Sequence, residues 1–251
     1  KRIDGVRNVI AVASGKGGVG KSTTAVNLAI ALRLEGLRVG LLDADVYGPS
    51  QPRMLGVSGR PASPDGKTIL PMRNHGVTMM SLGLMTREDE AVVWRGPMLM
   101  GALQQMLNQV QWGQLDVLLI DLPPGTGDTQ LTLAQKIPVS GAMIVTTPQD
   151  IALLDARKGL KMFEKVKVPV LGVVENMSTH VCSNCGHEEA IFGHGGGNAV
   201  AGDYETELLG QLPLTLQLRE QSDAGTPIVI ADPDAPTSVT MREVAAKVHT
   251  F

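Results

Sequence analysis

The feature that most constrains the fold is a glycine-rich loop between a predicted strand and a predicted helix. The loop reads Gly-Lys-Gly-Gly-Val-Gly-Lys-Ser-Thr over residues 15–23 and fits the pattern G-x-x-x-x-G-K-[ST]. The aliphatic run 9–13 precedes it, and a helical pattern over 22–35 follows at once. Such a loop needs a buried strand that delivers the chain to the N-terminus of a helix. The motif therefore predicts an α/β fold.

Short aliphatic runs alternate with helical stretches along the rest of the chain. The runs are continuous in hydrophobicity, which is typical of parallel strands buried on both faces. The predicted strands are residues 9–13, 39–42, 77–82, 117–120, 142–146, 170–174 and 208–212. The predicted helices are residues 22–35, 98–110, 129–136, 151–165 and 238–248. We predict one domain over residues 1–251, with a mostly parallel central sheet and helices on both faces.

The composition narrows the classes of partner. The 251 residues include 22 Lys and Arg against 25 Asp and Glu, for a formal net charge of −3. Because the basic residues form no block, we expect neither a nucleic acid nor an anionic membrane as partner. No apolar window reaches the ~18 residues of a membrane span. The cytoplasm is the expected compartment.

The loop residues have a defined chemistry toward a nucleotide. Glycines let backbone N–H groups turn onto phosphate oxygens, and the helix N-terminus adds positive potential. Lys21 is expected to reach the β- and γ-phosphates, and Ser22 to offer its hydroxyl to Mg²⁺. The ATP-binding residues predicted in the loop are Gly15, Lys16, Gly17, Gly18, Val19, Gly20, Lys21, Ser22 and Thr23.

A second lysine, Lys16, follows the first glycine of the loop. The motif needs only Lys21, so Lys16 is either a solvated surface residue or a cation that reaches a phosphate across a dimer interface. In the second case Lys16 and Lys21 are both catalytic.

Carboxylates stand at the ends of two further predicted strands. Asp43 and Asp45 follow one strand, and Asp121 ends the other. Open α/β sheets bind ligands at this edge, where Mg²⁺ takes one or two carboxylates with water and phosphate oxygens. We predict that Asp43, Asp121 and Ser22 hold Mg²⁺ and that Asp45 orients the attacking water. Residues 123–127 are interpreted as a switch segment.

The chain has two cysteines, Cys182 and Cys185, whose spacing lets both thiolates point at one metal centre. Structural zinc and [4Fe–4S] clusters each need four ligands. Three completions are open: His180 and His187 close a zinc site, the pair cycles as a dithiol, or two subunits each contribute two cysteines to a shared cluster. Dithiol cycling is least favoured because glycine-rich sequence rather than a helix follows the pair.

Several segments resemble known families. The loop resembles the deviant Walker A loop of MinD/ArsA-type P-loop ATPases, in which the lysine corresponding to Lys16 contacts nucleotide bound by the opposite subunit. From about residue 8 to 226 the chain resembles the Mrp/ApbC family of ATP-dependent iron–sulfur cluster carriers. The segments that carry this resemblance are residues 15–23, 43–50, 94–98, 121–128, 175–178 and 182–185.

The Mrp/ApbC resemblance implies a MinD-like P-loop fold, slow Mg²⁺-dependent ATP hydrolysis and a homodimer. It implies a [4Fe–4S] cluster held between subunits by Cys182 and Cys185 of each, for delivery to apo iron–sulfur proteins. It further implies that Asn176 hydrogen-bonds the adenine and that the backbone around Pro213 flanks the base. Many members carry a segment ahead of the P-loop domain, whereas this chain has 14 residues before Gly15.

Two other functions stay open. A positioning ATPase of the MinD/ParA sort needs an amphipathic membrane-targeting tail or a basic surface. The predicted C-terminal helix carries only two cations and fits a core-packed helix better. The other alternative is a zinc-stabilised nucleotide-binding module without carrier activity.

Overall fold

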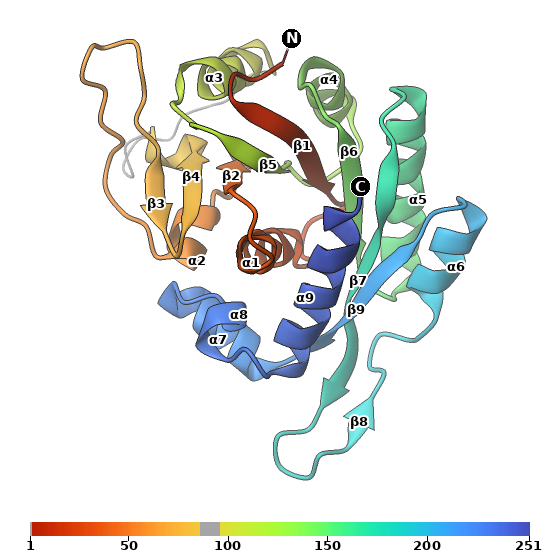
Figure 1. Cartoon of the computed structure of the whole chain (residues 1–251). Helices are drawn as coiled ribbons and strands as arrows, with labels where there is room; N and C mark the ends of the chain where they lie inside the picture. Colours follow the sequence, from red (N-terminus) through yellow and green to blue (C-terminus); the bar gives the residue numbers. More distant parts are fainter. Residues whose placement is uncertain (1, 86–95) are drawn as a thin grey trace.

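Residues 2–85 and 96–251 are described by the computed structural model, in which a mostly parallel sheet lies between two layers of helices (Figure 1). The strands are β1 (Val6–Ala13), β2 (Val39–Asp43), β3 (Met72–Asn74), β4 (Val77–Ser81), β5 (Leu115–Asp121), β6 (Gly141–Thr146), β7 (Val170–Val181), β8 (Glu188–Glu189) and β9 (Leu208–Leu214). The helices are α1 (Lys21–Leu34), α2 (Gln51–Leu55), α3 (Gly96–Gln109), α4 (Asp128–Lys136), α5 (Asp150–Lys165), α6 (Gly196–Asp203), α7 (Leu216–Ala224), α8 (Ile228–Ala231) and α9 (Pro236–His249), with a 3-10 turn η1 (Leu82–Leu84).

The sheet has the order β3-β4-β2-β5-β1-β6-β7-β8, and β9 also pairs with β7. Every described pairing is parallel except those of β3 with β4 and of β8 with β7. The predicted parallel α/β architecture is therefore confirmed. Parallel order brings the carboxyl ends of the strands to one edge, and the predicted loop and carboxylates lie at that edge.

Alternate side chains of β1 enter two separate apolar layers. Val9, Ala11 and Ala13 pack with α3, α4, α5 and α6 on one face, and Ile10 and Val12 pack with α1, α2, α8 and α9 on the other. Both faces of the central strands are thus buried, which explains why their sequences are continuously apolar rather than alternating.

Helix α9 lies within the second of these layers. Its side chains Met241, Val244 and Val248 are buried, and Gly210 of β9 approaches it so closely that an added Cβ would lie 2.7 Å from the Val244 side chain. The prediction of a core-packed C-terminal helix is confirmed. Among the described residues, no helix has the length and apolarity needed to cross a membrane.

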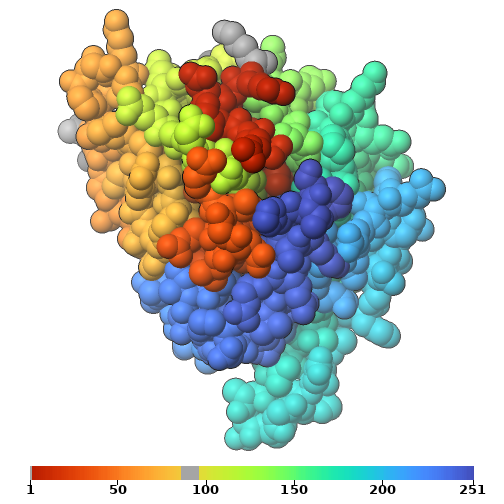
Figure 2. Space-filling model, viewed as in Figure 1, coloured from red at the N-terminus to blue at the C-terminus, as the bar shows by residue number. Residues whose placement is uncertain are grey.

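Strand β7 extends seven residues beyond its predicted end. The extension pairs with β9 and then with β8, and the β7–β8 hairpin projects from the body of the molecule (Figures 1 and 2). The projecting hairpin carries both cysteines. In the segment 94–98, residues 94 and 95 lie outside the described part of the chain, and Gly96 opens α3.

Candidate functional site

The glycine-rich loop joins β1 to α1 as its sequence predicts. Gly18 and Gly20 have φ angles of 79° and 81°, in the left-handed region that favours glycine. A Cβ at Gly20 would also lie 2.1 Å from the side-chain nitrogen of Asn176. Gly17 and Gly18 are exposed, so their backbone is accessible to a phosphate group.

Gly15 is required for a different contact. A Cβ at this position would lie 2.2 Å from the backbone carbonyl carbon of Asp155 in α5. The start of the loop therefore packs directly on α5, and a larger residue here would displace the loop.

Lys21 is buried and forms an ion pair with Asp121. Its Nζ donates a hydrogen bond to Asp121 Oδ1 and lies 3.3 Å from Ser22 Oγ. The two side chains are 5% and 0% exposed, so each charge depends on the other for compensation. A nucleotide that takes Lys21 onto its phosphates would release Asp121 Oδ1.

Asp43 lies beside Asp121 because β2 and β5 pair these two residues in register. Its Oδ1 accepts the backbone N–H of Asp45 at 3.1 Å. Its Oδ2 accepts the backbone N–H groups of Ser50 and Gln51, both at 3.1 Å, and the Ser81 hydroxyl at 3.2 Å. Both oxygens of Asp43 are thus engaged by the chain itself. Burial, and then the charge of Asp121, raises the pKa of Asp43 to about 7.

The raised pKa of Asp43 predicts a pH-dependent stability for the nucleotide-free protein. The folded state keeps a proton that the unfolded chain releases near pH 4, so the free energy of unfolding should fall as pH rises from about 4 to 7. Urea unfolding at pH 5 and pH 8 should show this loss, and Asp43→Asn should reduce it. Equal pH slopes in both proteins would contradict the assignment.

Asp45 and the predicted switch adjoin the same loop. Asp45 is half-buried. Its pKa is raised, chiefly because burial disfavours the charged carboxylate, and the charge of Lys21 offsets only part of this effect. Gly125 donates its backbone N–H to the Ser14 carbonyl at 2.9 Å. Lys16 is partly exposed, and its ammonium makes no ion pair with any described residue.

Asn176 and Pro213 come from neighbouring strands, since Asn176 of β7 pairs with Leu212 of β9. The side-chain nitrogen of Asn176 donates to the Val19 carbonyl at 2.9 Å. Its Oδ1 is buried and has no partner in the described part of the chain. The fold thus brings the loop, an amide acceptor and the Pro213 segment together.

The cysteines lie at the tip of the β7–β8 hairpin. The Cys182 N–H donates to the His187 carbonyl at 2.9 Å, and the Gly186 N–H donates to the Cys182 carbonyl at 2.9 Å. The backbone N–H groups of Cys185 and Asn184 lower the pKa of the Cys182 thiol, which favours the thiolate that binds metal. Cys185 is exposed.

The two histidines do not complete a metal site within one chain. His180 Nδ1 lies 3.2 Å from the Leu214 carbonyl, and His187 is exposed. Across residues 2–85 and 96–251, no three side chains of His, Cys, Asp or Glu form a group that could hold a metal ion. A four-ligand site at these cysteines therefore needs ligands from beyond the described residues of one chain.

Two buried polar residues of the site escaped the sequence analysis. Gln51, at the start of α2, donates a side-chain hydrogen bond to the Asp121 carboxylate at 2.9 Å. Glu175 of β7 is fully buried; its Oε2 accepts the Gly197 N–H at 2.6 Å and its Oε1 accepts the Gln211 side chain at 2.9 Å. Glu175 follows an apolar run at a strand end, the same pattern that marked Asp43 and Asp121. Gln51 follows no apolar run, and only the fold shows its burial.

Glu175 fixes the first turn of α6, through which the chain returns from the hairpin. Glu175→Ala should lower the free energy of unfolding by about 1–3 kcal/mol, because it leaves the buried Gly197 N–H unpaired. Glu175→Gln should cost less, since the exposed Gln211 amide can turn to keep both hydrogen bonds. Urea unfolding at pH 7 measures both variants. An alanine variant as stable as the unchanged chain would contradict this role.

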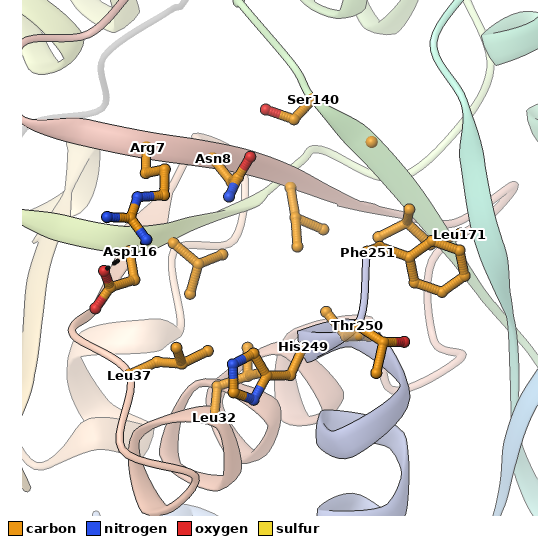
Figure 3. A pocket seen from close by; sticks show the side chains of 14 residues that line it. Arg7, Asn8, Leu32, Leu37, Asp116, Ser140, Leu171, His249, Thr250 and Phe251 are labelled. Atoms are coloured by element: carbon orange, nitrogen blue, oxygen red, sulfur yellow. Dashed lines mark ion pairs between the residues drawn. The ribbon is translucent and has the colours of Figure 1, made fainter.

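A cavity of about 350 Å³ lies at the opposite edge of the sheet (Figure 3). Arg7 and Asp116, 3.8 Å apart, lie on one side of it, and His249, Thr250 and Phe251 close the other. Its lining comes from strand beginnings and from the ends of α1 and α9, so it shares no residue with the glycine-rich loop.

The loop, the buried lysine and the strand-end carboxylates define a P-loop nucleoside triphosphatase fold. The family model described as NUBPL iron-transfer P-loop NTPase matches residues 5–249. This chain belongs to that family.

Curated relatives agree with this assignment. The chain is 60% identical over 247 residues to the iron-sulfur cluster carrier protein of Escherichia coli strain K12. The aligned residues cover 98% of this chain and 67% of the relative. It is 52% identical over 250 residues to the iron-sulfur cluster transfer protein NUBPL of Mus musculus, covering 99% of this chain and 78% of the relative.

Solved structures show the same fold. A nucleotide-binding protein of Archaeoglobus fulgidus in complex with ADP has a TM-score of 0.81 and 38% identity, over 95% of this chain and 93% of the other. The cell division ATPase MinD of Pyrococcus furiosus has a TM-score of 0.74 and 22% identity, over 97% and 98% of the two chains. The predicted MinD-like fold is confirmed.

Proposed function

We propose that this protein is an ATP-hydrolysing iron–sulfur cluster carrier that holds a [4Fe–4S] cluster between two copies of the chain and transfers it to apoproteins. The observation that carries the proposal is strand β7. Its Asn176 side chain donates to the glycine-rich loop, and the strand ends beside the half-buried Cys182 and the exposed Cys185, two thiols where a cluster needs four ligands.

The nucleotide half rests on residues that fit ATP. The exposed backbone of Gly17 and Gly18 would receive phosphate oxygens, and Lys21 would exchange Asp121 for the β- and γ-phosphates. The unpartnered Oδ1 of Asn176 is an acceptor suited to the adenine amino group, with Pro213 beside the base. The relative from Archaeoglobus fulgidus binds ADP, which supports this half.

Ser22 and Asp121 would hold Mg²⁺, with Asp43 beside them. When bound, Mg²⁺ would neutralise charge that develops on the phosphates during hydrolysis. The Asp43 oxygens are filled by its own chain, so Asp43 would act mainly by shaping this edge of the sheet. Asp45 would orient the attacking water, and Lys16 would reach a phosphate bound by the partner subunit.

The cluster half rests on the ligand count. Each chain offers Cys182 and Cys185, and a [4Fe–4S] cluster needs four ligands, so a homodimer supplies the full set. An exposed hairpin suits release to an apo iron–sulfur protein. The names of the relatives from Escherichia coli and Mus musculus support an iron–sulfur cluster as the group that is carried. A single domain over residues 1–251 and a cytoplasmic setting without membrane or nucleic acid complete the proposal.

A transfer assay tests the function. The anaerobically reconstituted protein is mixed with an apo enzyme whose activity requires a [4Fe–4S] cluster, with excess chelator to capture free iron. Recovery of enzyme activity despite the chelator supports direct transfer. Recovery that disappears with the chelator would contradict the carrier function.

A further inference from the structure

Gln51 joins the elements that would surround Mg²⁺. Its side-chain nitrogen donates to Asp121 Oδ2 and to the Ser22 carbonyl, both at 2.9 Å. Its backbone N–H donates to Asp43 Oδ2 at 3.1 Å. The residue is 0% exposed, and its Oε1 has no hydrogen-bond partner within the described part of the chain. Gln51 therefore donates to both carboxylates, to Asp43 from its backbone and to Asp121 from its side chain, and that side chain ends in an unused acceptor.

The hydrogen-bond network fixes the orientation of the Gln51 amide. The carboxylate of Asp121 and the carbonyl of Ser22 are both acceptors, so the group that faces them must be the donating NH₂. The reversed amide would set three oxygens against one another. The unpaired acceptor is therefore Oε1, and a buried carbonyl without a partner is unfavourable unless a ligand or water supplies a donor.

The two oxygens of Asp121 have different partners. Lys21 occupies Oδ1 and Gln51 occupies Oδ2. When Lys21 moves onto a phosphate, Oδ1 is released while Gln51 still holds Oδ2. The carboxylate then keeps its orientation through the exchange, because the second hydrogen bond does not depend on the nucleotide.

We infer that Gln51 is a positioning residue for the magnesium site, which orients Asp121 through its NH₂ group and accepts a hydrogen bond from a metal-bound water at Oε1. This inference rests on the proposed nucleotide site and adds a residue to it. Partners of this kind around a metal site typically alter metal affinity 10- to 100-fold when removed.

The test separates metal binding from nucleotide binding. Affinity for a fluorescent ADP analogue is measured in EDTA and across a Mg²⁺ titration, for the unchanged chain and for Gln51→Met, which keeps the length but has no donor. We expect Gln51→Met to weaken Mg²⁺ binding about 10- to 100-fold while the affinity in EDTA changes less than about threefold. Manganese EPR gives a second readout of the same site that does not depend on activity.

Leu55→Met is the matched control, because Leu55 is buried on the same helix and has no polar group. It should leave both affinities unchanged. If the Gln51→Met protein does not fold, Gln51→Asn, which retains an amide, takes its place. In either variant, a Mg²⁺ affinity equal to that of the unchanged chain would overturn the inference. Equal losses in EDTA and in Mg²⁺ would also overturn it, since they indicate a purely structural role. Failure of the unchanged chain to bind the analogue at all would contradict the proposed function itself.

Discussion

Lys21→Ala should reduce nucleotide affinity at least about 100-fold, because it removes the buried cation beside Asp121 that we propose moves onto the β- and γ-phosphates. It should also lower the free energy of unfolding by about 3–5 kcal/mol, since it leaves the Asp121 carboxylate buried without its partner. The measurements are calorimetric titration with Mg²⁺-ATP and urea unfolding.

A double variant separates these two effects of Lys21. Lys21→Ala with Asp121→Asn removes both charges, so it should recover most of the lost stability but none of the affinity. Lys16→Ala is the matched control within the same loop: it should bind nucleotide normally and hydrolyse ATP more slowly. Equal losses of binding in the Lys16 and Lys21 variants would contradict a role for Lys16 across the dimer interface.

Cys182→Ala should abolish cluster binding while leaving nucleotide affinity and stability unchanged. The variant dimer would retain two of four cysteine ligands, too few for a [4Fe–4S] cluster. Cys182 lies near the tip of the projecting hairpin, away from both apolar layers, so its removal should cost under about 0.5 kcal/mol. Anaerobic reconstitution followed by iron and sulfide analysis measures the loss.

Ser183→Ala is the control for the cysteine variant, because Ser183 is an exposed neighbour in the same turn. It should reconstitute like the unchanged chain. Cys182→Ala with full iron and sulfide content would contradict the assignment of the ligands.

The strands and the loop could be predicted because their residue types directly reflect the contacts that these segments make in the folded protein. Residues 9–13 are apolar on every side because helices cover both faces of β1, and Gly20 is glycine because both its φ angle and the Asn176 contact require it. Asp121 could be placed at the sheet edge from the apolar run before it.

What the sequence could not predict depends on contacts between distant segments. Gln51 is polar and precedes a proline, and its burial follows only from the packing of α2 over the ends of β2 and β5. The sequence predicts that the β7 strand ends at residue 174, because polar residues follow. The structure continues it to Val181, since β9 supplies pairing partners 34 or more residues along the chain and β8 supplies them across a turn. Gly15 packs on α5, a contact that no local pattern contains.

Native mass spectrometry under anaerobic conditions tests whether two chains share one cluster through four cysteines. The reconstituted protein should show a dimer carrying four iron and four sulfide, and Cys182→Ala should show no cluster. One metal ion for each chain, retained by a monomer, would contradict a cluster shared between two subunits.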